Sequence, residues 1–156
     1  MFNVNSQDVR RFFSHVWHHR FDMLLEPMEK MALRIILAHP EYQPYLERVE
    51  DYIDFVWSPE LGQTNPFLHL SLHLSIQEQV SIDQPRGIAT LHQQLCEQEG
   101  DWVLAEDKMM DALVEMIWKA QRSGTGFDVN EYVTHLRRLL GLGSEDNARL
   151  NPHEIK

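Results

Sequence analysis

The sequence predicts an all-α fold, in which six to seven helices form a single-domain bundle around a central buried helix at about residues 66–80. Large apolar side chains recur at intervals of three and four residues along most of the chain, which is the spacing of one helical face. Prolines stand where these helices would begin and glycines where they would end. One leucine-rich segment has apolar residues around most of its circumference, as a buried helix does.

Composition limits the class of protein. The chain has 156 residues, of which 43% are hydrophobic, and a formal net charge of −10, so we expect one globular domain. Nucleic acids and anionic membranes select basic surfaces, and neither is expected as a partner. The single cysteine, Cys96, cannot form an intramolecular disulfide, which favours a cytoplasmic location. No segment resembles a signal peptide or a membrane span.

The first expected helix begins at Ser6, which can cap it. Its apolar side chains share one stripe: Val9, Phe12, Phe13, Val16 and Trp17. His15 and His19 lie on the other side, with the four-residue spacing of two metal ligands. Because this pair faces away from the apolar stripe, a solvated face is the favoured interpretation.

Two further helices are expected before residue 60. Pro27 suits the first turn of the second, and His39-Pro40 ends it. The third runs from about residue 44 to 55, with five side chains expected in the core: Tyr45, Val49, Tyr52, Ile53 and Val56. Six carboxylates on the outer side outnumber the single Arg48: Glu41, Glu47, Glu50, Asp51, Asp54 and Glu60. A solvated face is favoured, with a cation or a basic partner as the alternative.

The central segment gives conflicting signals. Apolar residues from Leu68 to Ile76 alternate strictly with histidines and serines, which is typical of a half-buried strand. Against a strand, the segment is nearly free of β-branched residues, and Asn65-Pro66 places a capping residue before a proline at the first helical position. We therefore predict a buried helix, on which His69, His73 and Gln77 share one stripe.

Three helices are expected after the central one. The first opens at Pro85, the longest runs from about Trp102 to Arg122, and the last lies between a capping Asp128 and Gly141. These elements complete a helical domain at residues 1–143. The polar, aperiodic residues 144–156 predict a flexible C-terminal tail.

The sharpest chemical hypothesis is a site for a divalent metal ion. His69 and His73 lie one helical turn apart, so both imidazoles can reach one ion, and a further ligand must come from another helix. Glu115, at the centre of the long helix, and Glu106 are the candidates. The segment lacks the glutamate that follows the first histidine in zinc peptidases. A structural role for the histidine pair, hydrogen-bonded within the core, is the favoured alternative.

Polar residues bracket the central segment. Short polar side chains at helix ends cap backbone groups, and an architectural role is favoured for Asn65 and Asp83. Arg86 is the exception, because a lone cation among carboxylates could hold a neighbouring helix or an anionic ligand.

Three blocks of the sequence form recognisable motifs. The first block begins with Asn65-Pro66-Phe67-Leu68-His69-Leu70-Ser71 and continues with His73-Leu74, Glu78-Gln79, Ser81-Ile82-Asp83-Gln84-Pro85 and Gly87-Ile88. The second block is Glu115-Met116-Ile117-Trp118 followed by Ala120-Gln121-Arg122-Ser123-Gly124. The third block is Phe2-Asn3 followed by Val9-Arg10-Arg11-Phe12-Phe13. Over about residues 1–140 the chain resembles an uncharacterised bacterial family, the domain of unknown function 1841 (DUF1841). The resemblance implies a small cytoplasmic single-domain protein. It marks His69, His73, Glu78 and Asp83 as motif positions without assigning them a role.

The sequence supports two alternative functions, of which the first is favoured. The first is a non-catalytic cytoplasmic interaction or regulatory protein, which binds another protein through an acidic surface and helical grooves. The second is a metal-binding helical-bundle protein, with a hydrolase as one version of it, whose ligands are His69, His73 and Glu115. Whether the protein is an enzyme is left open. Stoichiometric metal in the purified protein distinguishes the two functions.

Overall fold

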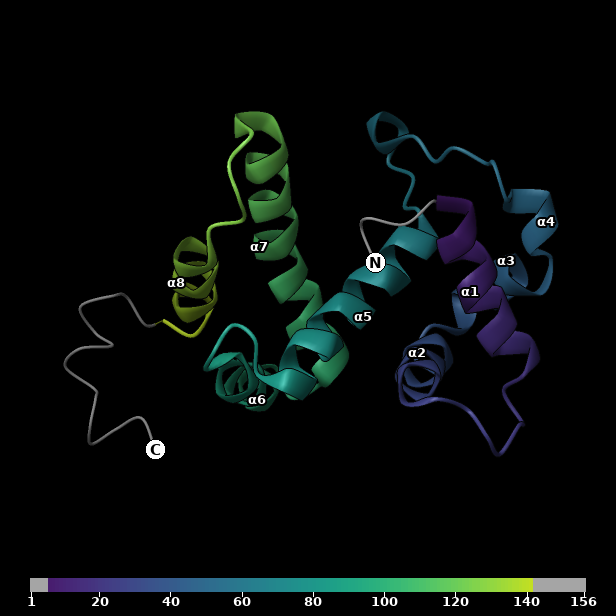
Figure 1. Ribbon diagram of the computed structural model, residues 1–156, viewed down its shortest axis with the longest axis horizontal. Helices are drawn as coiled ribbons and strands as arrows, with labels where there is room; N and C mark the ends of the chain where they lie inside the picture. Colours follow the sequence, from purple (N-terminus) through teal and green to yellow (C-terminus); the bar gives the residue numbers. More distant parts are fainter. Residues whose placement is uncertain (1–5, 142–156) are drawn as a thin grey trace. The chain divides into compact units, whose positions relative to one another are not determined.

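The computed structural model of the protein describes residues 6–141, which form eight α-helices, two short 3₁₀ helices and no strand (Figure 1). The all-α prediction is confirmed, with more and shorter helices than expected. The chain divides into two compact units, residues 1–78 and 79–156, and the boundary falls within helix α5 (Pro66–Ile82). The single domain expected at residues 1–143 stays a prediction. The expected tail, 144–156, lies outside the described residues.

In the first unit, α1 (Ser6–His18) packs against α2 (Pro27–Leu37) and α3 (Gln43–Glu47). Most of the expected stripe of α1 is buried, with Phe13 and Val16 at its centre. The opposite side is solvated, as expected. There His15 pairs with Glu29 and His19 with Asp22, at 3.4 and 3.0 Å.

The third expected helix is not continuous. The chain instead forms η1 (Pro40–Tyr42), α3, α4 (Val49–Tyr52) and, after a loop, η2 (Pro59–Leu61). Arg48 separates α3 from α4 with φ −123° and ψ 50°, outside the helical region. The expected core stripe is also wrong, because Leu46 is the buried side chain and Val56 is 81% exposed.

Hydrogen bonds from α1 explain this break. Ser14 Oγ donates to the Leu46 carbonyl at 2.7 Å. Arg10 Nη1 donates to the carbonyls of Tyr52 and Phe55 at 2.5 and 2.9 Å. A continuous helix would use the Leu46 carbonyl internally, whereas the carbonyls of Tyr52 and Phe55 would lie in its last turn without an internal partner. The bond from Ser14 is thus a tertiary contact that competes with the local helical pattern.

We predict that Arg10→Met destabilises the protein by about 2–3 kcal/mol, because hydrogen bonds to a charged group contribute more than neutral ones. Arg10 is only 8% exposed, and burial lowers the pKa of its guanidinium, an effect that Asp54 partly offsets. Urea unfolding measures the change. Arg11→Met, which removes an exposed ion pair with Glu50, is the control and should barely move the midpoint. Equal midpoints for the two variants would contradict the prediction.

The central segment is helical, so the conflict between strand and helix is resolved as predicted. Asn65 Oδ1 accepts hydrogen bonds from the backbone N–H groups of Phe67 and Leu68, at 3.0 and 3.1 Å. Leu70 and Leu74 are fully buried. The N-terminal cap and the proline at the first helical position therefore prevail over the alternating pattern.

The second unit contains α6 (Ile88–Glu99), α7 (Trp102–Ser123) and α8 (Val129–Leu139), with α7 packed against both of the others. Tyr132 of α8 is fully buried and its hydroxyl donates to Gln79 Oε1 at 2.8 Å. Burial raises the pKa of Tyr132, so the phenol stays neutral. Over residues 6–141, no helix is both long and apolar enough to cross a membrane.

Candidate metal centre

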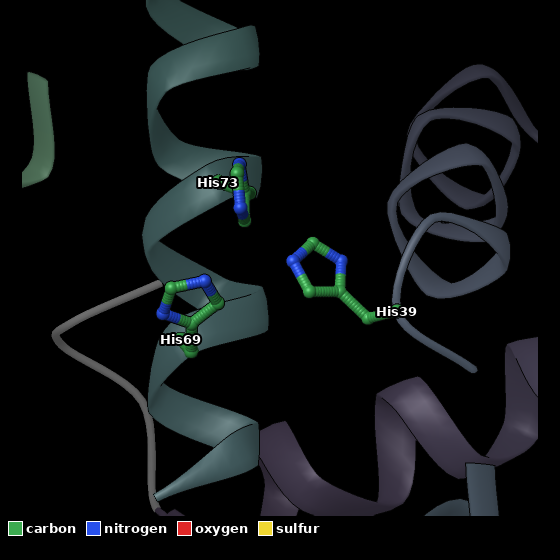
Figure 2. A group of neighbouring side chains, drawn as sticks. All are labelled: His39, His69 and His73. Atoms are coloured by element: carbon green, nitrogen blue, oxygen red, sulfur yellow. The ribbon is translucent and has the colours of Figure 1, made fainter. Parts of the chain in front are cut away.

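Three histidines of the first unit lie together, as Figure 2 shows. His69 and His73 project from successive turns of α5, and His39 faces them from the turn that follows α2. One ring nitrogen of each residue lies within 4.8 Å of the other two. Among residues 6–141, this is the one group of three or more His, Cys, Asp or Glu side chains whose ligand atoms lie close enough together to share a metal ion.

The local sequence fixes the position of His39. The residue before a proline avoids the helical region, and His39, which precedes Pro40, has φ −128° and ψ 65°. The chain therefore leaves α2 here, and the ring turns toward α5 (Figure 2). His39 Nδ1 lies 2.8 Å from the carbonyl of Ile35, in the last turn of α2.

This hydrogen bond determines which nitrogen of His39 can bind a metal. A carbonyl oxygen only accepts, so Nδ1 must carry the proton. In the neutral ring, Nε2 then keeps the lone pair. Metal-binding histidines usually donate their other ring N–H to a carbonyl or carboxylate, which fixes the ring's orientation. His39 has that arrangement before any ion is added.

The three rings are packed and largely removed from water. His73 is fully buried, His39 is nearly so, and His69 is half-buried. The ring centroids lie 4.8 to 5.2 Å apart, with interplanar angles of 56° to 77°. Tyr42 stacks on His39, with its ring centroid at 5.4 Å and an interplanar angle of 5°. Solvent therefore reaches the group mainly beside His69.

A metal ion would draw the rings closer together. Three nitrogens bound to one zinc ion, at the usual bond length and tetrahedral angles, lie about 3.3 Å apart, whereas the nitrogens here lie within 4.8 Å. Small rotations of the side chains close that difference. The present edge-to-face arrangement also suits packed neutral imidazoles, which is the structural role considered from the sequence.

The third member of the group is His39, which the sequence did not indicate as a ligand. Glu115 belongs to the second unit. There its carboxylate lies 3.5 Å from His135 Nε2 and 3.7 Å from Lys119 Nζ. The structure thus adds His39 to His69 and His73, and the ligand set expected from the sequence, with Glu115, stays a prediction.

Glu106, the other carboxylate considered as a ligand, also lies in the second unit. It is fully buried on α7, where its Oε2 lies 2.7 Å from His92 Nε2 of α6. Cys96 also lies beside that imidazole, with Sγ 3.8 Å from Nδ1 and 3.9 Å from Nε2. A sulfur almost equidistant from both nitrogens is not aligned for proton transfer to either. The geometry therefore suits a structural thiol and not a nucleophile.

Two of the four remaining motif positions hold helix ends. Asn65 caps α5, and Asp83, which has φ 51°, accepts hydrogen bonds at Oδ1 from Gly87 N and Ala89 N at 3.1 and 3.0 Å. Arg86 is exposed and acts on Asp83 through its charge. Glu78 lies half-buried on α5. Asn65 and Asp83 thus have the architectural role favoured from the sequence.

The Asp83 cap should make stability depend on pH. Hydrogen bonds from Ala89 and then Gly87, with a smaller contribution from Arg86, lower the pKa of its carboxyl group. A lowered folded-state pKa stabilises the fold above the unfolded value, about 3.9, and this stabilisation is lost as pH falls through the folded value. We expect Asp83→Ala to unfold at lower urea than wild type at pH 7, and the gap to narrow below about pH 4.

Asp83→Asn is the matched control for the charge. It keeps an oxygen at the cap, so its urea midpoint should fall less than that of Asp83→Ala at pH 7. A gap between wild type and Asp83→Ala that stays constant from pH 7 to pH 3 would show that the carboxylate charge contributes nothing.

Comparison with known proteins gives one match. A family model described as a domain of unknown function (DUF1841) matches residues 5–138. No curated protein and no solved structure matches the chain. The resemblance seen in the sequence motifs is confirmed, and the matched range includes all three histidines. The match supplies no activity, so the functional argument depends on the geometry.

Proposed function

The chain belongs to the DUF1841 family, and we propose that the protein binds a divalent transition-metal ion through His39, His69 and His73. The gathering of three imidazoles in one unit is the observation that supports this function. Imidazole ligands suit zinc, copper, iron and nickel, whereas magnesium and calcium require oxygen ligands. Zinc is the expected ion, because three histidines and an open position form one of its common sites.

The surroundings support binding in two ways. His39 already donates Nδ1–H to the carbonyl of Ile35, so its ligand nitrogen is set in advance. His69 and His73 come from one rigid helix, which holds their spacing. His69 and His73 therefore lose little conformational freedom when the ion binds. The ring of His39 is already held in place by the hydrogen bond from its Nδ1.

Three imidazoles would leave a fourth position open to water, and zinc there would act as a Lewis acid and lower the pKa of that water. Hydrolysis would also need a general base. Across residues 6–141 the close group contains histidines and no carboxylate. The proposal is therefore metal binding, and it names no reaction.

Metal analysis of protein purified without chelator tests the proposal. We expect about one equivalent of zinc in the wild type, and a large loss in His39→Ala and His69→Ala. His19→Ala is the matched control, because His15 and His19 have the same four-residue spacing on an exposed helical face. It should keep its metal. Circular dichroism confirms that each variant is folded, and substoichiometric metal in all four proteins would refute the proposal.

A protein partner is the second candidate, and one surface favours it. The loop between α1 and α2 exposes three large apolar side chains, Phe21, Met23 and Leu24, by 84%, 93% and 92%. Large apolar side chains exposed close together in the sequence are candidates for an interaction site. Replacing Phe21, Met23 and Leu24 by serine should abolish association with a partner while leaving the metal content unchanged, which separates the two candidate functions.

The proposed location of the protein is the cytoplasm, which suits a chain with a single cysteine.

A further inference from the structure

The first unit contains a second feature that metal binding does not explain, a cavity with aromatic walls. It measures about 470 Å³ and is lined by Tyr45, Tyr52, Phe55, Trp57, Gln63 and Thr64. Cavities that hold small molecules usually measure about 300–1,000 Å³. The walls come from α3, α4 and the loop that follows α4, so the broken helix that the sequence did not predict creates this space.

The four rings support one another. Tyr45 meets Tyr52 edge-on at a centroid distance of 4.8 Å, and Phe55 lies 4.6 Å from Trp57. Tyr52 and Trp57 are nearly parallel, at 22° and 6.3 Å. Because aromatic faces carry partial negative charge, a set of rings around one space attracts a cation that can give up its water.

The charge of the surrounding chain favours the same kind of ligand. Six carboxylates and one guanidinium lie in residues 41–60. Ion pairs with Arg11 and Arg48 engage Glu50 and Asp51, which leaves the segment acidic. Such a field raises the local concentration of cations. This charge pattern and the ring geometry are separate observations, and both indicate a cation.

The protein already places one of its own cations on this aromatic group. The Arg10 guanidinium lies 5.1 Å from the centroid of the Trp57 ring and 5.4 Å from that of Phe67. Its charge is engaged by the carbonyls of Tyr52 and Phe55, and Arg10 does not line the cavity. The rings of Tyr45, Tyr52 and Phe55, which line the cavity, therefore remain as the main contacts of a ligand.

We propose that this cavity binds a quaternary ammonium group. Its lining residues include no carboxylate, so the wall offers a primary ammonium no charged acceptor in exchange for its water. A methylated ammonium has no N–H groups to satisfy and is the cation that aromatic cages accept. Gln63 Oε1 accepts from Ser58 N at 2.8 Å, which leaves its amide N–H groups, with the Thr64 hydroxyl, for a polar end of the ligand.

Choline and its uncharged isostere 3,3-dimethylbutan-1-ol are the probes. They have the same shape, so the difference in affinity isolates the positive charge. Titration of the full chain, followed by NMR of the tryptophan indole N–H signals, should show saturable binding of choline. We expect the isostere to bind about tenfold more weakly. If choline and its isostere bound with equal affinity, the cavity would recognise apolar shape and not positive charge, which would overturn the proposal. Choline binding that does not saturate would overturn it as well.

Two variants locate the site. Tyr45→Leu and the half-exposed Phe55→Leu each remove one aromatic wall, and each should weaken choline binding about tenfold. Trp118→Leu is the control, because Trp118 is an exposed aromatic that carries Arg122 over its ring in the second unit. It should bind choline like wild type. Unchanged binding by both cavity variants, with circular dichroism like that of wild type, would place the cation elsewhere and refute the proposal.

Discussion

Zinc should raise the free energy of unfolding of the wild type by about 2.7 kcal/mol when free zinc is 100 times its dissociation constant. An ion held by His39, His69 and His73 joins the turn after α2 to α5 within the first unit. The unfolded chain does not hold these residues together, so binding stabilises the folded state. Urea unfolding of samples with zinc and with chelator measures the difference.

Two conditions separate this stabilisation from non-specific effects of zinc. His39→Ala should lose most of the zinc-dependent increment, whereas His19→Ala should keep it. Protons compete with the ion for imidazole nitrogens, so the increment should also shrink as pH is lowered from 7 to 5. The same increment in His39→Ala as in wild type would show that zinc acts at another place.

Replacing Glu106 should have the second large effect. Its carboxylate is fully buried and lies 2.7 Å from His92 Nε2, joining α7 to α6 in the second unit. Removing one partner of a buried hydrogen-bonded pair leaves the other unsatisfied, which typically costs about 1–3 kcal/mol and more where a group is charged. We therefore expect Glu106→Ala to lose at least about 2 kcal/mol in urea unfolding.

Glu106→Gln and Lys119→Ala are the controls for that change. Glu106→Gln keeps the volume and an oxygen that can accept from His92, so its loss should be smaller. Lys119→Ala removes ion pairs with Glu115 and Glu131 whose side chains are about 40% exposed, and should cost less than about 1 kcal/mol. If Glu106→Ala were no more harmful than Lys119→Ala, the buried pair would contribute little.

Helices with strong local signals were predicted most reliably. On α5, Asn65 and Pro66 fix the start of the helix, and α7 has its cap at Asp101 and a left-handed glycine, Gly124, at its end. These effects act over a few residues, so neighbouring sequence is sufficient to predict them. The prediction of one continuous third helix failed because the Leu46 carbonyl, which such a helix would use internally, accepts from Ser14 of α1, more than 30 residues away.

The candidate metal centre was half predicted for the same reason. His69 and His73 lie one turn apart, and helical spacing alone places them on one face. His39 appeared in the sequence only as the residue before Pro40, where it marks the end of α2. Nothing in the local sequence connects it to α5. The one local signal for His39 is its position directly before a proline that ends a helix. That position fixes the backbone of His39, but it does not predict which residues the ring contacts.

By itself, the sequence determined the all-α class, the ends of most helices and the histidine pair on α5, because capping and helical periodicity depend on nearby residues. Only the tertiary structure decided that His39 joins that pair. It also decided that residues 43–52 break into two helices and line an aromatic cavity. Those features depend on which distant segments pack together, and that follows from burial and hydrogen bonding across the whole unit.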